Sequence, residues 1–188
     1  MTRRLILLRH GQTEYNATSR MQGQLDTELS DLGFQQAASA ASVLVQKNIT
    51  HVFSSDLSRA FNTASAVAAL IDAEVCVDKR LRETHLGEWQ AKTHPEVDSE
   101  YPGARAQWRH DPQWAPPGGE SRVDVARRAR QVVDELMVSL DDWDEGTVLI
   151  VAHGGTINAL TSNLLDRAYD QYPMFSGLGN TCWAQLTA

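Results

Sequence analysis

Apolar and polar residues follow two different rhythms along this chain. Short apolar runs at Leu5 to Leu8 and Thr147 to Val151 are typical of strands that are buried on both faces of a sheet. Further short runs predict strands at His51 to Ser54, Glu74 to Val77 and Thr181 to Leu186. The longer segments between them predict helices, from Ser30 to Lys47, from Asp56 or Ser58 to Ile71, from Ser121 to Leu140 and from Gly155 to Leu165.

Strands that alternate with helices predict an α/β fold, a three-layer sandwich with a mainly parallel central sheet and helices on both faces. Ser30 is the expected N-cap of the first long helix, and Asp56 or Ser58 is the expected cap of the next one. The helix from Ser121 to Leu140 carries arginines on one face. Its other face is apolar, with residues at three- and four-residue spacing: Val125, Ala129, Val132, Val133 and Leu136.

Two segments lack a sustained period. Residues 12–27 are polar and contain glycine, which predicts a loop over the sheet edge. Residues 90–119 hold two tryptophans and five of the six prolines, which predicts an insertion of loops with a short helix. The prolines are Pro95, Pro102, Pro112, Pro116 and Pro117, and the tryptophans are Trp108 and Trp114.

Composition narrows the class of protein. A chain of 188 residues with 42% hydrophobic and 22% charged residues is typical of one globular domain, here residues 1–188. No run approaches the roughly 18 apolar residues of a membrane span, and the first apolar run is too short for a signal peptide. We therefore expect a cytoplasmic protein. Cys76 and Cys182 are isolated, which predicts reduced thiols.

Charge argues against two kinds of partner. A formal net charge of -7 disfavours nucleic acid and an anionic membrane surface, which both require a basic face. Three of the 17 basic residues are lysine, so the other 14 are arginine, the side chain that binds phosphate and carboxylate bidentately. A bias in base composition explains this arginine content equally well.

Two of the predicted strands end at a histidine followed by glycine, in Arg9-His10-Gly11 and in Ala152-His153-Gly154. Ligands of open α/β sheets bind outside the carboxyl ends of the strands, so the two imidazoles are expected to meet there. Histidine can act as a nucleophile, arginine can neutralise a transferring group, and glycine admits close backbone approach. The pattern favours phosphoryl transfer, although each histidine alone would more often be structural.

The segments after the next two strands add a cation and carboxylates. Arg59 falls in the first turn of a predicted helix, where free N–H groups and the helix dipole favour anions. Glu83 and Glu88 follow the third strand, and either could protonate a leaving alcohol and then activate water. The residues alone do not choose between them. A surface ion pair of Glu83 with Arg80 or Arg82 is the structural alternative.

Four segments in order resemble the histidine phosphatase superfamily, in its phosphoglycerate-mutase-like branch. They are residues 9–13 with Asn16, residues 54–60, residues 81–83 and residues 152–155. The resemblance implies that His10 becomes phosphohistidine and that Glu83 is the proton donor and then the base. It also implies a cationic pocket of Arg9, Arg59 and His153, with substrate contacts from Asn16, Gln22 and Gly154.

Three further segments, residues 21–30, 81–90 and 114–125, resemble the actinobacterial glucosyl-3-phosphoglycerate phosphatases within that family. Those enzymes act on the route to methylglucose lipopolysaccharides. The resemblance implies a small phosphomonoester as substrate, no required cofactor, and a homodimer. His85, His94 and His110 lack metal-ligand spacing, so no metal site is expected.

Three alternative functions stay open. A phosphoglycerate mutase would use the same intermediate, but an insertion of about thirty residues is short for a lid that excludes water. A broad-specificity phosphatase of the same family is the second alternative, and a module that binds phosphate without turnover is the third. Trp89, Trp108 and Trp114 are expected to pack in the interior, with recognition of a sugar as their functional alternative.

Overall fold

The computed structural model describes residues 2–141 and 143–188. Its centre is a five-stranded sheet in the order β3-β2-β4-β1-β5. The strands are β1 (Arg4–Arg9), β2 (Ile49–Ser54), β3 (Val75–Val77), β4 (Thr147–Ala152) and β5 (Trp183–Thr187). The first four are parallel and β5 pairs antiparallel with β1, which confirms the prediction of a mainly parallel sheet.

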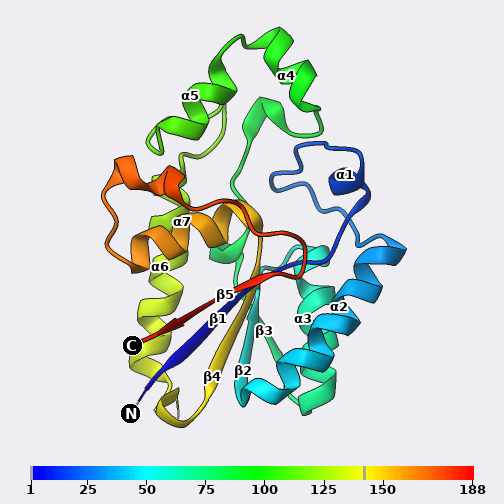
Figure 1. Ribbon diagram of the computed structural model, residues 1–188, viewed down its shortest axis with the longest axis vertical. Coiled ribbons are helices and arrows are strands. Elements are labelled where there is room, and N and C mark those ends of the chain that lie inside the picture. Colours follow the sequence, from blue (N-terminus) through cyan, green and yellow to red (C-terminus); the bar gives the residue numbers. More distant parts are fainter. Residues whose placement is uncertain (1, 142) are drawn as a thin grey trace.

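Helices cover both faces of this sheet and complete the predicted three layers. In Figure 1, α2 and α3 lie on one side of the strands and α6 and α7 on the other, while α4 and α5 stand beyond the top of the sheet. The helices are α1 (Glu14–Ala17), α2 (Asp31–Leu44), α3 (Ser58–Ile71), α4 (His94–Glu100), α5 (Ala104–His110), α6 (Arg122–Ser139) and α7 (Gly154–Leu164). Short 3₁₀ turns span Val45–Lys47, Lys79–Leu81, Gly87–Trp89, Trp143–Glu145 and Tyr169–Met174.

The apolar run of β1 explains why the strand is buried on both faces. Successive side chains of a strand point to opposite faces. Leu5 and Leu7 join the core under α6 and α7, whereas Ile6 and Leu8 join the core under α2 and α3. All six residues of β4 are buried in the same way. A continuous apolar run is thus what a central parallel strand requires.

The predicted helix boundaries hold within a few residues, and one predicted cap is wrong. The Ser30 hydroxyl accepts a hydrogen bond from Gly33 N at 3.1 Å, as expected of an N-cap. Neither Asp56 nor Ser58 caps α3, whose N-cap residue is Leu57. The carboxylate of Asp26 accepts hydrogen bonds from Ser58 N and Oγ at 2.7 and 3.0 Å instead. A side chain from a distant loop therefore satisfies this helix terminus.

The insertion contains two short helices, α4 and α5, rather than the single one expected. It has its own apolar centre, in which Trp89 and Val97 are fully buried. Its two ends are joined where Glu88 N donates to Pro117 O at 3.0 Å and Glu120 N donates to His85 O at 2.8 Å. The polar loop of residues 12–27 likewise contains one short helix, α1. The insertion thus stands over the carboxyl ends of the parallel strands (Figure 1).

The apolar face predicted for α6 is confirmed, because all five of the expected core residues are buried. Cys76 and Cys182 are both free and exposed. Within residues 2–141 and 143–188, none of the helices is both long enough and apolar enough to cross a membrane.

Candidate active site

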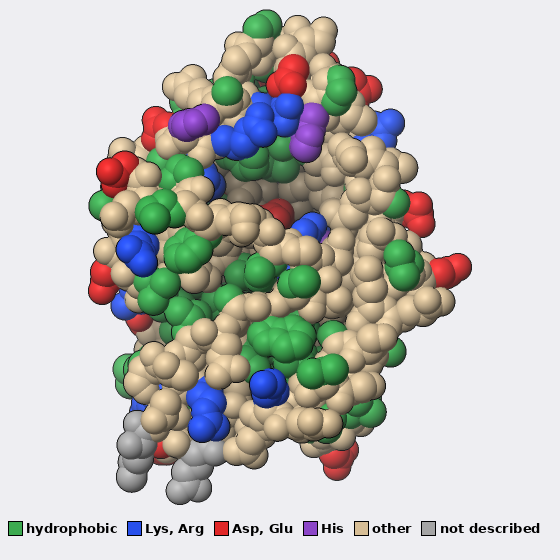
Figure 2. Space-filling view, viewed as in Figure 1, with side chains coloured by type: hydrophobic (Ala, Val, Ile, Leu, Met, Phe, Trp, Pro, Cys, Tyr) green, Lys and Arg blue, Asp and Glu red, His purple; other side chains and the backbone are tan. Residues whose placement is uncertain are grey.

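A cavity of about 450 Å³ lies at the carboxyl ends of the parallel strands, and Figure 2 shows it as a hollow under the insertion. Seven of the eight predicted site residues line it, namely Arg9, His10, Asn16, Gln22, Arg59, Glu83 and Gly154. The eighth, His153, is fully buried beside His10, with the two ring centroids 5.1 Å apart. The fold therefore gathers residues that are up to 145 positions apart in the chain, from Arg9 to Gly154.

His10 follows the last residue of β1 and is only 2% exposed. Its Nδ1 lies 2.6 Å from Gly11 O. Because a carbonyl oxygen can only accept, Nδ1 carries the proton and Nε2 keeps its lone pair. Burial, together with the guanidinium groups of Arg59 and Arg9, holds the pKa of His10 well below 6.5. The ring is thus a neutral imidazole with a free nucleophilic nitrogen.

His153 is the N-cap residue of α7, at the end of β4. It is 0% exposed, and neither ring nitrogen has a hydrogen-bond partner within the described residues. Burial lowers its pKa well below 6.5, and the nearby charge of Arg59 and the ring of His10 lower it further. His153 therefore offers polar nitrogen atoms that no other part of the described chain satisfies.

Arg59 enters the site from the first turn of α3, as predicted, and is 1% exposed. Backbone oxygens hold it: NH1 donates to Leu25 O at 2.7 Å and NH2 donates to Gly23 O at 2.8 Å. Burial lowers the pKa of Arg59 to about 10, which leaves the group charged at neutral pH. A buried cation held by neutral carbonyls keeps most of its charge for a bound anion.

Arg9, the last residue of β1, also lines the cavity. Its NH1 donates to Leu178 O, and its Nε is buried without a hydrogen-bond partner in the described chain. The guanidinium packs against Gly154, where a Cβ would lie 3.5 Å from Arg9 Nε. Arg9 and Arg59 thus both place a positive charge close to the neutral ring of His10.

Glu83 faces the N-terminus of α7. Its carboxylate accepts hydrogen bonds from Thr84 N at 2.8 Å and from Gly155 N and Thr156 N at 3.1 Å each. Gly155 allows this approach, because a Cβ there would lie 2.5 Å from Glu83 Oε1. The free N–H groups and the dipole of a helix N-terminus favour a negative charge at this position.

Of the two glutamates that the residues left open, the structure places only Glu83 at the cavity. Glu88 is exposed, accepts a hydrogen bond from Tyr101 OH, and does not line the cavity. The structural alternative for Glu83 also fails, because its expected ion-pair partners are engaged elsewhere. Arg82 pairs with Asp56 at 2.7 Å, and Arg80 pairs with Asp78 and Glu135.

Two side chains that sequence reasoning missed hold the backbone of Glu83. Arg128 NH2 and Gln24 Nε2 donate to Glu83 O at 2.9 and 3.0 Å. Glu120 joins them, since its carboxylate accepts hydrogen bonds from Arg128 Nε at 2.9 Å and from His85 N at 2.8 Å. Arg128 belongs to the helix face that the sequence assigned to solvent, so helical periodicity gave no signal for it.

Asn16 and Gln22 turn their oxygens away from the cavity. Asn16 Oδ1 accepts from Thr13 N at 3.1 Å and from Asn180 Nδ2 at 3.2 Å. Gln22 Oε1 accepts hydrogen bonds from the hydroxyls of Thr13 and Thr27. With the oxygens occupied, the amide N–H groups are the ends left to donate to an anion.

The three tryptophans have different surroundings. Trp89 is fully buried and packs against Trp114, with ring centroids 5.6 Å apart. Trp108 contacts Trp89 edge to face and lines the cavity. Packing is thus the observed environment of Trp89 and Trp114, whereas Trp108 is available to a ligand.

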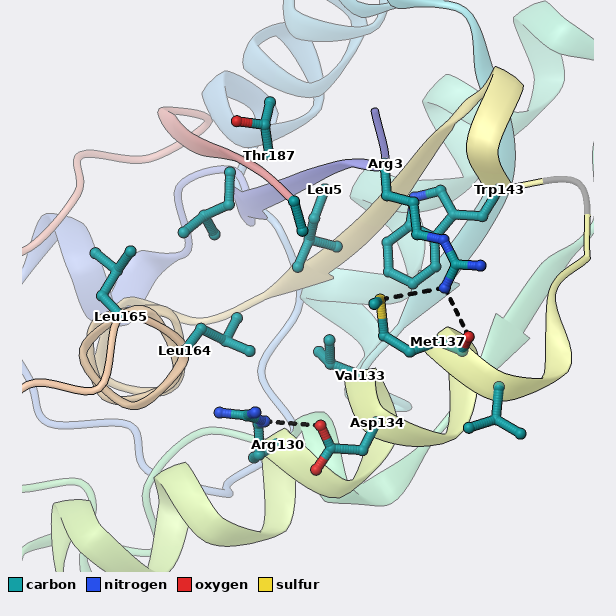
Figure 3. Close-up of a pocket in the computed structure, with 13 residues that line it drawn as sticks. Arg3, Leu5, Arg130, Val133, Asp134, Met137, Trp143, Leu164, Leu165 and Thr187 are labelled. Carbon is teal, nitrogen blue, oxygen red and sulfur yellow. Dashed lines mark hydrogen bonds and ion pairs between the residues drawn. The ribbon is translucent and has the colours of Figure 1, made fainter. Parts of the chain in front are cut away.

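A second cavity, between α6, α7 and the two terminal strands, differs in character (Figure 3). Its wall includes the apolar side chains of Val133, Met137 and Leu164. The charged groups at its edge are already paired, Arg130 with Asp134 and Arg3 with Asp144, at 2.7 and 2.8 Å. This surface therefore lacks the unpaired cations that a phosphate requires.

The fold and the site together define a phosphoryl-transfer enzyme with paired histidines. The chain belongs to the histidine phosphatase superfamily (branch 1), whose family model matches residues 5–188. Glucosyl-3-phosphoglycerate phosphatase of Mycolicibacterium vanbaalenii is 55% identical to it over 188 residues, which cover 98% of this chain and 84% of the relative. The enzyme of that name from Mycobacterium tuberculosis is 52% identical over 190 residues, with 98% and 85% covered.

A solved structure supports the same relationship. Mycobacterial glucosyl-3-phosphoglycerate phosphatase in complex with VO3 superposes with a TM-score of 0.95 at 53% identity. The match covers 97% of this chain and 92% of that one.

Proposed function

We propose that this protein is a phosphomonoesterase that hydrolyses glucosyl-3-phosphoglycerate through a phosphohistidine on His10. The observation that carries the proposal is the fixed tautomer of His10, whose Nδ1–H donates to Gly11 O at 2.6 Å. This leaves Nε2 unprotonated in a cavity that the guanidinium groups of Arg9 and Arg59 and the carboxyl group of Glu83 also line. Nucleophile, charge stabilisers and proton donor are thus available in one place.

In the first step, His10 Nε2 attacks phosphorus, so that an N–P bond forms and the P–O bond to the substrate alcohol breaks. The leaving alkoxide takes a proton from Glu83, which begins the cycle as a carboxylic acid. The first step ends with phosphohistidine, a free alcohol and a Glu83 carboxylate.

In the second step, the Glu83 carboxylate takes a proton from water as the water oxygen attacks phosphorus. A new O–P bond forms, the N–P bond breaks, and inorganic phosphate leaves with His10 neutral again. Glu83 regains its proton in this step, so one residue acts as acid and then as base. The N–H groups at the start of α7 hold the carboxylate that exists between the two steps.

Arg9 and Arg59 stabilise the charge on the phosphoryl oxygens, and the amide groups of Asn16 and Gln22 add neutral donors. Positioned charge of this kind accounts for most of the rate enhancement in phosphoryl transfer. His153 is neutral because its pKa is lowered well below 6.5, rather than the cation that the resemblance implies, and it supplies a nitrogen beside His10. The proposed reaction uses no metal and no cofactor. Among the described residues, no three His, Cys, Asp or Glu side chains are grouped to hold a metal ion.

The names of the relatives support glucosyl-3-phosphoglycerate as the substrate. A screen of phosphate release tests it, with glucosyl-3-phosphoglycerate, 3-phosphoglycerate, phosphoserine and glucose 6-phosphate ranked by kcat/KM. We expect the glucosylated substrate to exceed each of the others at least about 10-fold, the effect of roughly 1.4 kcal/mol of additional transition-state binding. Equal values would favour a broad-specificity phosphatase. Transfer of phosphate between hydroxyls of 3-phosphoglycerate, without release, would favour a mutase.

The covalent intermediate has its own test. Wild-type protein that is quenched during turnover of ³²P-labelled substrate should carry acid-labile, base-stable label. His10→Ala should carry none, whereas the exposed Arg127→Ala should be labelled like wild type. Phosphate binding without label or turnover in the wild type would point to a binding module instead.

The location of the protein and its oligomeric state belong to the same proposal. We place the enzyme in the cytoplasm, where phosphorylated sugar acids are made, and infer a homodimer from the family resemblance. Light scattering should give about twice the 20.8 kDa mass of one chain. A monomer at micromolar concentration would contradict the second part.

A further inference from the structure

The cavity has an outer wall whose charged groups the proposed reaction does not use. The residues at the ends of the strands and the start of α3, among them His10 and Arg59, form what we call the floor of the cavity. Arg20 and His94 also line the cavity, but they come from the loop before α2 and from the insertion. These segments are joined, because Arg20 and Thr93 form an antiparallel bridge and Met21 N donates to Lys92 O at 2.9 Å. His94 directly follows Thr93, so the fold brings both side chains to the wall of the same cavity.

The charge of Arg20 is only partly satisfied. Its NH1 donates to Ala91 O at 2.8 Å and lies 3.8 Å from a Glu96 carboxylate oxygen. Its other two nitrogen atoms have no hydrogen-bond partner within the described chain. The Glu96 carboxylate is itself used by the cap of α4, since it accepts hydrogen bonds from Thr93 N and Oγ1. Arg20 therefore has donors available for a ligand.

His94 lies in a positive environment. Burial lowers its pKa, and the neighbouring guanidinium groups of Arg105 and Arg109 lower it further, against a smaller effect of Asp98. Arg105 is neutralised by Asp98 at 2.6 Å, whereas Arg109 donates only to Arg105 O. Figure 2 shows Lys or Arg side chains and histidine side chains gathered directly above the hollow. Glu83 is the sole acidic residue among the described residues that line the cavity.

We propose that Arg20 and His94 form a second anion subsite, which binds a carboxylate on the part of the substrate that is not transferred. The inference rests on the proposed phosphatase function and names the feature by which the site selects among phosphate esters. A phosphate on the floor occupies Arg9 and Arg59, so a second negative group a few bonds away needs other partners nearer the mouth. A glycerate carboxylate is such a group. Arg20 supplies a positive charge at the mouth, and the imidazole of His94 supplies an N–H donor.

The remaining wall suits the carbon skeleton of the same substrate. Met21, Leu86 and Trp108 line the cavity beside the two basic residues. An indole and two aliphatic side chains can pack against C–H surfaces of a glycerate or of an attached sugar. The floor thus handles the phosphoryl group, and the wall distinguishes what that group is attached to.

Pairs of substrates that differ by one carboxylate test the subsite. Phosphoserine and phosphoethanolamine form such a pair, as do 3-phosphoglycerate and glycerol phosphate. For Arg20→Gln and His94→Gln, we expect kcat/KM on the carboxylate member to fall about 10- to 100-fold, the effect of losing a hydrogen bond to a charged group. The loss should appear mainly in KM. The member without a carboxylate should change less than about twofold.

Two control variants keep the result interpretable. Arg20→Lys retains a positive charge and should recover part of the loss. Arg127→Gln alters an exposed arginine whose side chain is 68% accessible, and should change neither substrate. Thermal unfolding shows whether each variant is folded. Equal losses on both members of a pair by a folded variant, or no loss on either, would overturn the proposal.

The same measurements separate this inference from the proposed function. If wild type prefers carboxylate-bearing esters but shows no preference for glucosyl-3-phosphoglycerate, the substrate assignment fails and the subsite stands. If wild type prefers glucosyl-3-phosphoglycerate and the Arg20 and His94 variants lose nothing on it, the subsite fails and the substrate assignment stands.

Discussion

The floor and the mouth of the cavity are built in different ways. The floor residues His10, Arg59 and His153 are at most 2% exposed and stand at the ends of strands or the start of a helix. The residues at the mouth, Arg20 and His94, are exposed and come from a loop and the insertion. The floor is thus fixed by the sheet, and the mouth by segments that can vary without disturbing it.

This difference matters because the strength of a charge depends on its surroundings. Charges on the floor act where water is excluded, so their effect on a phosphoryl group is large. At the mouth, water and salt screen the charges, and each contact has a smaller effect. We therefore expect floor variants to lose turnover of every substrate, and mouth variants to lose selectivity.

Arg59→Met should give the largest effect. The substitution keeps most of the side-chain volume and removes the buried charge that Gly23 O and Leu25 O hold in place. Loss of a cation aimed at the transferring group should lower kcat about 10³-fold. Turnover of p-nitrophenyl phosphate and of a carboxylate-bearing ester should fall together. A loss confined to carboxylate-bearing esters would contradict the expectation that floor variants lose turnover of every substrate.

Gly155→Ala should give the next largest loss. A Cβ at this position would lie 2.5 Å from Glu83 Oε1, so the carboxylate must leave the N-terminus of α7. Because Glu83 can swing away, the fold should remain intact while kcat falls about 10²-fold, within the range of general acid catalysis. The matched control is Gly154→Ala, where the nearest atom is Arg9 Nε at an ordinary 3.5 Å. Equal losses in both variants would argue against displacement of Glu83.

Stability should fall as the pH drops below 6.5. The pKa values of His10 and His153 lie well below 6.5 in the folded protein, whereas the unfolded chain takes up protons near that value. Stability is therefore complete above pH 6.5, and it is lost toward the folded pKa values, by up to about 1.4 kcal/mol per pH unit for each histidine. Urea unfolding at pH 7.5 and 5.5 should differ by about 2 kcal/mol.

Variants test whether His10 and His153 cause this pH dependence of stability. The double variant His10→Gln with His153→Gln should lose most of the difference between the two pH values. His94→Gln, at the exposed mouth, should keep most of it. The ionised carboxylates of Asp56 and Glu120 have lowered pKa values, so they act at more acidic pH. An unchanged difference in the double variant would show that the floor histidines are not its source.

Arg128→Ala should give the smallest of the four effects. The side chain donates to Glu83 O, to Arg80 O and to the Glu120 carboxylate, and it does not line the cavity. Its loss should therefore act through a misplaced Glu83 and lower kcat about 10-fold, roughly the effect of one hydrogen bond. The loss should appear in kcat and leave KM unchanged. Arg128→Lys should recover part of the activity. A lower melting temperature with an unchanged kcat would indicate a purely structural role.

The sequence predicted best those elements whose pattern of apolar residues follows from the position of the element in the sheet. β1 and β4 are continuous apolar runs because both faces of a central strand are covered. The meeting of His10 and His153 could be predicted because ligands of such sheets bind at the carboxyl ends of the strands. The cap of α3 could not be predicted, because Asp26 lies 32 residues before Ser58 and reaches it only through the folded loop.

The site shows the same division. The amino-acid sequence by itself determined which chemical groups are present, their order, and the sheet edge at which they meet. The tertiary structure alone decided that Glu83 rather than Glu88 faces the N-terminus of α7, that Arg128 donates to the backbone of Glu83, and that Arg20 and His94 line the same cavity. Residue type and periodicity are local properties, whereas the partner of a side chain depends on segments brought together by folding. Glu83 and Glu88, two carboxylates that follow the same strand, can therefore have entirely different surroundings.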